Sequence, residues 1–177
     1  MQRWRVPLGF ICAALFVVFA RPTRLTLTAG GVVALFGLLL RAWSAGHIRK
    51  NAALAVAGPY AYTRNPLYLG SFIIGLGFTI AAARPALAVL FGLLFLSIYL
   101  PVMRVEAATL EQLFGTDYRE YAQEVPLFLP RLLPYRRERG ERVGFEAGLY
   151  MRYREYEAAL GLLVIWGILL AKALYWK

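Results

Sequence analysis

Five blocks of apolar residues, separated by short polar connections, constrain the fold of this chain more than any other feature. The blocks cover about residues 6–20, 25–45, 67–83, 86–103 and 158–176. An apolar helix of about 20 residues is long enough to cross the hydrocarbon core of a bilayer. The sequence therefore predicts an all-α, polytopic membrane helical bundle of about five transmembrane helices. The 177 residues leave room for one integral membrane domain, 1–177, and for no separate soluble catalytic domain.

The first block has features of both a signal peptide and a membrane anchor. Arg3 and Arg5 precede its apolar centre, and Val18-Phe19-Ala20 resembles a small-residue cleavage site. Another apolar block follows at once, as it does after an uncleaved signal anchor. We therefore expect this block to remain as the first span.

The charge distribution predicts the topology. The formal net charge is +10, but no helix-turn-helix, zinc ligand set or RNA-binding motif accompanies it, so we expect no nucleic acid partner. With five spans, the N-terminus, the connection around 46–66 and the segment 104–157 share one side of the membrane, and that side holds most of the 20 Lys and Arg. Because cytoplasmic connections carry an excess of basic residues, we expect a multi-pass protein of the inner (plasma) membrane of a prokaryote, with this side cytosolic.

A polar and aromatic segment, residues 58–70, lies between the second and third blocks, and we call it the polar hinge. It contains Tyr60, Arg64, Asn65 and Tyr68, and no Asp or Glu precedes it in the chain. Polar side chains at the edge of the hydrocarbon are costly unless they line a cavity or bind a ligand. The hinge is therefore the first candidate for a functional site.

All ten acidic residues lie in a single later stretch, between Glu106 and Glu157. Within it, apolar and aromatic residues recur at helical spacing over about 106–124, with charged residues on the opposite side. This pattern predicts an amphipathic helix on the cytosolic face of the membrane. The hinge and this helix should therefore meet at one membrane face.

Two motifs in these segments resemble those of the isoprenylcysteine carboxyl methyltransferase family, which also includes bacterial phospholipid methyltransferase-like members. The first family motif is Gly-x-Tyr followed by Arg-His-Pro-x-Tyr-x-Gly, and it is met here by Gly58, Tyr60, Arg64, Pro66, Tyr68 and Gly70. The second is a Glu-Glu pair, then Leu, Phe-Gly, two spaced Tyr and Val-Pro, and it is met by Glu106, Leu110, Phe114, Gly115, Tyr118, Tyr121, Val125 and Pro126. The chain departs from these motifs at Asn65, where the family has His, and at Ala107, where it has a second Glu.

The resemblance implies a membrane methyltransferase that uses S-adenosylmethionine as cofactor and acts on a lipid-like or prenylated acceptor. In the family, the positions that hold this cofactor match Tyr60, Asn65, Pro66, Leu67, Tyr68 and Glu106. The position of a substrate-binding Arg in the family is Val102 here, so Arg104 is the nearest candidate for that role. Membrane lipids are the expected surroundings and source of the acceptor, and no metal is expected.

The chemistry of methyl transfer fits this set of residues. The enzyme has to align the donor with the acceptor and to exclude water, without a covalent nucleophile. Arg64 or Arg104 can bind a carboxylate of the cofactor or of the acceptor. Asn65 cannot remove a proton, so an amine acceptor requires desolvation or a base, for which His47, the only histidine, is the candidate. A carboxylate acceptor requires no base.

Other interpretations of the same residues stay open. The tyrosines also fit an interfacial aromatic belt, Arg64 fits a topogenic charge, and His47 fits an interfacial residue without a role. A nicotinamide-dependent (NADPH) membrane reductase of the sterol-reductase type is a second enzyme class, because those enzymes share an Arg-His-Pro-x-Tyr element. A non-enzymatic lipid-binding membrane protein is the third class. Only the methyltransferase hypothesis uses both motifs together.

Overall fold

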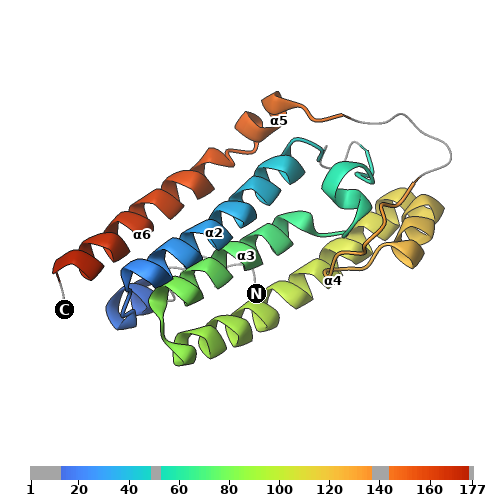
Figure 1. Ribbon diagram of the computed structural model, residues 1–177. Coiled ribbons are helices and arrows are strands. Elements are labelled where there is room, and N and C mark those ends of the chain that lie inside the picture. Colours follow the sequence, from blue (N-terminus) through green and yellow to red (C-terminus); the bar gives the residue numbers. More distant parts are fainter. Residues whose placement is uncertain (1–12, 49–52, 137–143, 176–177) are drawn as a thin grey trace.

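The computed structural model describes residues 13–48, 53–136 and 144–175, and within these ranges the protein is helical without a strand. The elements are a helix over 13–19, α2 (Arg24–Ala45), the 3-10 helix η2 (Gly58–Ala61), α3 (Pro66–Ala82), α4 (Pro85–Glu124), α5 (Ala147–Arg152) and α6 (Tyr156–Tyr175). The helices α2, α3, α4 and α6 extend along a common direction (Figure 1). The predicted all-α membrane bundle is confirmed.

Three of these helices, α2, α4 and α6, are long and apolar enough to cross a membrane. The helix α3 is shorter: its 17 residues extend over roughly 26 Å at about 1.5 Å per residue. It ends at Ala83, which adopts a left-handed φ of 51°, and α4 starts directly afterwards at Pro85. The predicted first span, 6–20, is described only from residue 13 onwards, and its earlier residues lie outside the described ranges.

The closest helix pair is α2 and α3, whose backbones touch through glycines. A Cβ atom on Gly30 would lie 2.4 Å from the carbonyl oxygen of Gly77, and one on Gly37 would lie 2.6 Å from that of Gly70. Small residues on both helices allow this approach, as they commonly do in membrane helix pairs. The contact fixes α3, and with it the end of the polar hinge, against the carboxyl-terminal half of α2.

The sequence predicts a fourth span that ends near residue 103 and a separate helix over 106–124. In the structure both belong to one helix, α4, so the predicted boundary between them is wrong. The helix continues through both segments for 40 residues and changes direction only at Gly115, with φ 54° and ψ −120°. Pro101 does not end the helix, because a membrane helix tolerates an isolated proline. A left-handed φ favours glycine, so Gly115 is where the chain turns back.

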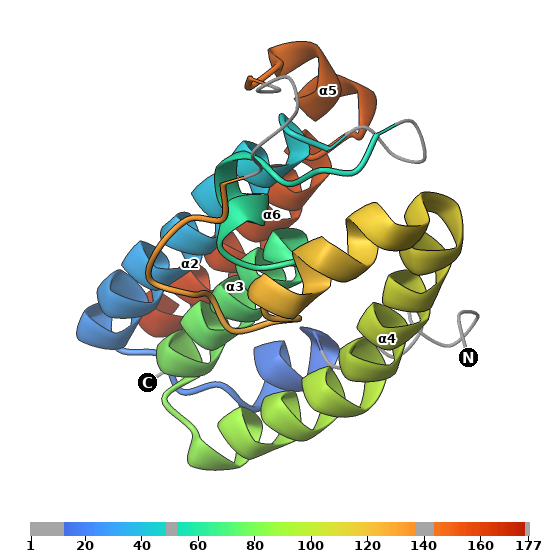
Figure 2. The same ribbon diagram turned by 90° about the vertical axis from the view of Figure 1, so that its right-hand side faces the viewer.

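Beyond α4 the chain returns along the polar hinge as an extended segment, residues 125–136, which we call the strap. Three backbone hydrogen bonds join the two: the N–H of Arg64 to the oxygen of Pro126 (3.0 Å), that of Arg131 to Tyr62 (2.9 Å) and that of Tyr135 to Ala61 (2.9 Å). Figure 2 shows the strap beside the hinge, with the end of α4 at the same end of the bundle. The predicted meeting of the hinge and the acidic segment is therefore observed.

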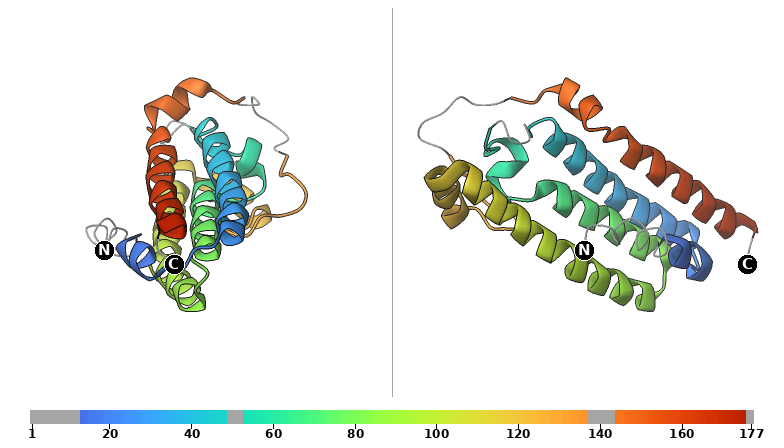
Figure 3. Two further views of the ribbon diagram at one scale, coloured as in Figure 1. Left: turned by 60° about the vertical axis from the view of Figure 1, so that its left-hand side comes forward. Right: turned by 180° about the vertical axis from the view of Figure 1, so that it is seen from behind.

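The opposite end of the bundle holds an apolar core and a half-buried polar anchor, Lys172. The core contains Phe16, Ala20, Leu27, Ala81, Ala82, Leu87 and Leu169. The ammonium of Lys172, near the end of α6, donates to the carbonyl oxygens of Val17 (2.8 Å) and Val18 (2.6 Å). Views from two further sides place the end of α6 near the helix over 13–19 (Figure 3).

The substitution Gly37→Ala tests the contact between α2 and α3. Its Cβ would meet backbone atoms of Gly70 and Ile74 at 2.6 and 2.7 Å, so the helices have to separate. We expect a loss of about 1–3 kcal/mol in the free energy of unfolding, measured by denaturation in detergent. Gly92→Ala is the matched control, because nothing lies within 4 Å of its Cβ. Equal stability of the two variants would contradict the proposed packing.

The substitution Gly115→Ala tests the turn in α4. Nothing lies within 4 Å of the added Cβ, so the whole effect comes from the left-handed backbone, a strain of about 1–3 kcal/mol. We expect faster hydrogen exchange over residues 116–135, because the returning segment loses its fixed position. Gly161→Ala, in α6 and also without neighbours within 4 Å, serves as the control. Unchanged exchange in Gly115→Ala would show that the turn does not hold this segment.

Candidate functional site

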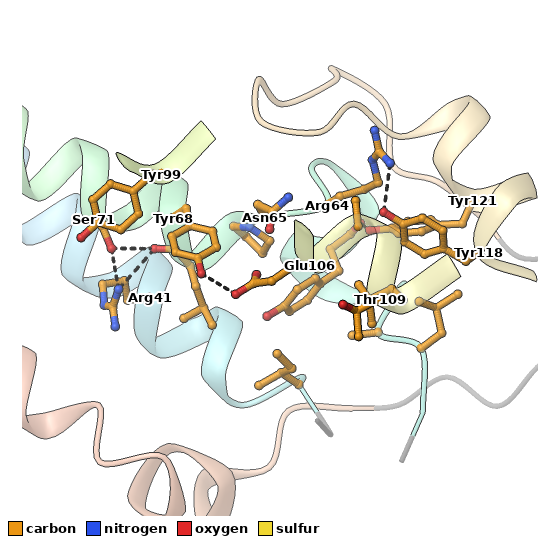
Figure 4. Close-up of a pocket in the computed structure, with 18 of the residues that line it drawn as sticks. Arg41, Arg64, Asn65, Tyr68, Ser71, Tyr99, Glu106, Thr109, Tyr118 and Tyr121 are labelled. Atoms are coloured by element: carbon orange, nitrogen blue, oxygen red, sulfur yellow. Dashed lines mark hydrogen bonds between the residues drawn. The ribbon is translucent and has the colours of Figure 1, made fainter. Parts of the chain in front are cut away.

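A cavity of about 540 Å³ lies at the hinge end of the bundle, and we call it the hinge cavity. Its wall combines residues of α2, η2, α3 and α4 with Glu155, which precedes α6. This volume falls within the range of about 300–1,000 Å³ that is typical of small-molecule pockets. Figure 4 shows that side chains from distant parts of the chain converge on it.

All six residues predicted to bind the cofactor line the hinge cavity: Tyr60, Asn65, Pro66, Leu67, Tyr68 and Glu106. The hydroxyl of Tyr68 donates a hydrogen bond of 2.6 Å to Oε1 of Glu106. This bond joins α3 to α4 and the first motif to the second (Figure 4). The structure thus brings the two motifs into one wall.

Side chains of the hinge hold it against the strap. The amide of Asn65 donates to the carbonyl oxygen of Leu127 at 2.9 Å, and the hydroxyl of Thr63 donates to that of Phe128 at 2.9 Å. The Tyr121 hydroxyl donates to the carbonyl oxygen of Tyr60 at 2.7 Å. Asn65 therefore lines the cavity and also secures the strap.

Two buried polar atoms of this region have no hydrogen-bond partner among the described residues: the hydroxyl of Tyr60 and Nε of Arg64. An unpaired buried polar group costs about 1–3 kcal/mol, and a bound ligand is one reason for its presence. Burial, followed by the carboxylates of Glu155 and Glu106, raises the pKa of Tyr60 above its usual value. Its hydroxyl thus stays neutral and available to donate and to accept.

Arg64 and Arg104 meet at a second cavity of about 480 Å³, which Arg119 also lines, and we call it the arginine cavity. Arg64 lines both cavities, whereas Arg104 lines only the second of these two. Nη1 of Arg64 donates to the hydroxyl of Tyr118 at 3.0 Å, and its Cζ lies 5.8 Å from the centroid of that ring. Arg64 and Tyr118 line both cavities and so separate them. Arg104 lines the arginine cavity, on the other side of these two residues from the hinge cavity.

His47 lines neither of the two cavities, and its ring packs against Gly58 at the start of the hinge. It is 8% exposed, and its Nδ1 lies 2.9 Å from the carbonyl oxygen of Trp43. Because a carbonyl only accepts, Nδ1 carries the proton of this hydrogen bond. Gly58, with a φ of 59°, leaves room for the ring, since a Cβ there would lie 2.6 Å from Nε2. The structure does not bring His47 to the other predicted residues.

Several lining residues were absent from the sequence prediction, above all Arg41, Ser71, Tyr99 and Glu155. Arg41 Nε and Nη2 donate to the Glu155 carboxylate at 2.7–3.0 Å, and Nη1 donates to the Ser71 hydroxyl at 2.6 Å. The signal for Arg41 was its position inside an apolar block, where a charge requires a partner. Its partner is 114 residues away in sequence, so no local pattern identifies Glu155.

The sequence matches the family model described as phospholipid methyltransferase over residues 25–117. This range contains the polar hinge and Glu106. No solved structure matches the chain.

Curated relatives fall into two groups. The cobalt-zinc-cadmium resistance protein CzcN of Cupriavidus metallidurans is 34% identical over 76% of this chain and 65% of its own length. The nickel-cobalt-cadmium resistance protein NccN of Alcaligenes xylosoxydans xylosoxydans is 30% identical over 76% of this chain and 66% of its own length. The protein-S-isoprenylcysteine O-methyltransferase of Schizosaccharomyces pombe is 34% identical over 48% of this chain and 36% of its own length.

The chain thus spans less than two thirds of the length of these relatives. The family match covers more than half of the 177 residues of this chain, and it includes both Tyr68 and Glu106, whose hydrogen bond joins the two motifs. On this ground the chain belongs to the phospholipid methyltransferase family.

Proposed function

We propose that this protein transfers a methyl group from S-adenosylmethionine to a lipid-like or prenylated acceptor at the cytosolic face of a prokaryotic inner membrane. One observation carries the proposal: two family motifs from separate parts of the sequence line one cavity, which has a buried hydroxyl without a partner among the described residues. The family match favours methyl transfer over the reductase and lipid-binding alternatives. The positive-inside rule supports the cytosolic orientation.

The residues of the hinge cavity fit S-adenosylmethionine chemically. We assign its binding to Tyr60, Asn65, Pro66, Leu67, Tyr68 and Glu106. The Glu106 carboxylate accepts hydrogen bonds from hydroxyl or ammonium groups of the cofactor. The aromatic rings of Tyr68 and Tyr99, 5.4 Å apart, offer faces for stacking and for a cation. When bound, this cofactor supplies a methyl group on a positively charged sulfur.

The protein's task is then to orient the two reactants and to keep water out. The strap and the hinge fix the cavity wall through hydrogen bonds, which favours alignment. We assign Arg64 and Arg104 to an anionic group of the acceptor, because the arginine cavity shares Arg64 with the hinge cavity. Since His47 lies outside both cavities, an amine acceptor would lose its proton through desolvation, and a carboxylate acceptor needs no base.

Binding of S-adenosylmethionine to the purified protein in detergent tests this proposal directly. We expect a saturable heat of binding in titration calorimetry, for the cofactor and for S-adenosylhomocysteine. Thermal unfolding should shift upward with ligand concentration, since a ligand that binds only the folded state stabilises it. A wild-type protein that is folded and binds neither compound would refute the proposed function.

The substitution Tyr60→Phe separates ligand binding from stability. It removes a buried hydroxyl that has no partner among the described residues, so the unliganded protein should keep or gain stability. Affinity for S-adenosylmethionine should fall about tenfold, the loss of one good hydrogen bond. Tyr175→Phe is the control, because Tyr175 is 88% exposed. Lower stability of the ligand-free Tyr60→Phe variant with unchanged affinity would reverse this assignment.

A further inference from the structure

The wall of the hinge cavity includes a charged pair that joins the family core to the rest of the chain. Arg41 lies in α2, inside the range of the family match, whereas Glu155 lies 38 residues beyond its end at residue 117. Both side chains are largely buried, with 21% and 11% of their surfaces exposed, and both line the cavity. The segment before α6 therefore contributes to the site.

The guanidinium of Arg41 is held from three directions. Its Nε and Nη2 bind both oxygens of Glu155, and its Nη1 binds the carbonyl oxygen of Leu67. The same Nη1 binds the hydroxyl of Ser71 (Figure 4). Such a forked contact fixes the plane and the position of the carboxylate. A carboxylate has about four lone-pair sites, so Glu155 keeps capacity to accept from a further group.

The charges around the cavity are unevenly distributed. Among the described residues, the carboxylates of Glu155 and Glu106 and the guanidinium of Arg41 act electrostatically on the Tyr60 hydroxyl, and all of them line the cavity. Arg64, a further described cation of the wall, instead donates to Tyr118. Counted over the described residues, two carboxylates therefore face one guanidinium beside Tyr60, whose buried hydroxyl has no partner among these residues. A positively charged ligand group is the complement of this arrangement.

We propose that Glu155 and Tyr60 form a subsite for a cationic group of the cofactor, its sulfonium or its ammonium, and that Arg41 is the positioning residue that holds Glu155 there. This inference rests on the proposed function and deepens it. The carboxyl-terminal segment, outside the family match, completes the binding site. A subsite for the sulfonium would also bind the neutral sulfur of the product more weakly and so assist its release, whereas a subsite for the ammonium would bind cofactor and product alike.

The variant Glu155→Gln tests the subsite by calorimetry with two ligands. We expect its affinity for S-adenosylmethionine to fall about tenfold or more, as for the loss of a charged hydrogen-bond partner. If S-adenosylhomocysteine keeps its affinity, the subsite binds the sulfonium; if both ligands lose affinity, it binds the ammonium. Glu157→Gln is the matched control, because Glu157 is 55% exposed and pairs with the exposed Arg154 at 3.0 Å. We expect a change of no more than about twofold there.

The double variant Arg41→Gln/Glu155→Gln distinguishes ligand contact from a merely structural pair. It removes both charges together, so no buried charge is left unpaired and much of the stability lost in Glu155→Gln should return. Under our proposal, the double variant still binds S-adenosylmethionine as weakly as Glu155→Gln. Affinity restored with stability, or wild-type affinity in Glu155→Gln, would overturn the subsite. A wild-type protein that binds neither ligand would instead refute the proposed function.

Discussion

The backbone contact between α2 and α3 fixes the geometry on which the site depends. Because Gly30 and Gly37 lie directly against Gly77 and Gly70, neither helix is free to rotate or slide without a clash. This register places Arg41 of α2 within hydrogen-bonding distance of Leu67 and Ser71 at the start of α3. The geometry of the polar end of the bundle thus depends on the glycine interface that starts next to Arg41 and continues along α2 and α3.

The hinge end combines groups that are expensive to bury, and the fold stabilises them by mutual pairing. Arg41 pairs with Glu155, Tyr68 with Glu106, and the hinge backbone with the strap. Such pairing satisfies polar groups near the hydrocarbon, where unpaired ones are costly. Among the described residues, the exceptions are the Tyr60 hydroxyl and Arg64 Nε, and a bound ligand is the partner that we propose for them.

The sequence predicts the helical bundle and the meeting of its two motifs because both depend on local patterns. Apolar blocks of membrane length identify helices, and the Arg64-to-Gly70 and Glu106-to-Pro126 spacings identify the cavity wall. The ligand roles of these residues stay predictions. The boundary within α4 was missed because helical periodicity continues through residues 104–105, and only the backbone angle at Gly115 shows the turn.

Contacts between distant residues escaped prediction for a different reason. Arg41 fits a topogenic charge and Glu155 fits an interfacial belt until the fold brings them together. His47 shows the reverse case: its chemistry favoured a role as base, but its ring packs against Gly58 and lines neither cavity. Residue type indicates what a side chain is able to do, and only the packing decides which neighbours it reaches.

The attachment of α6 has a consequence for how the protein is made. Of its residues, Leu169 alone is buried, yet both ends of this segment are tied by polar contacts: Glu155 to Arg41, and Lys172 to the carbonyls of Val17 and Val18. Arg41, Val17 and Val18 all precede α6 by more than 100 residues, so they are synthesised well before their partners. A nascent chain therefore carries Arg41 without its carboxylate partner until Glu155 has been translated. The cavity wall is completed only when the segment before α6 reaches the helices that are already made.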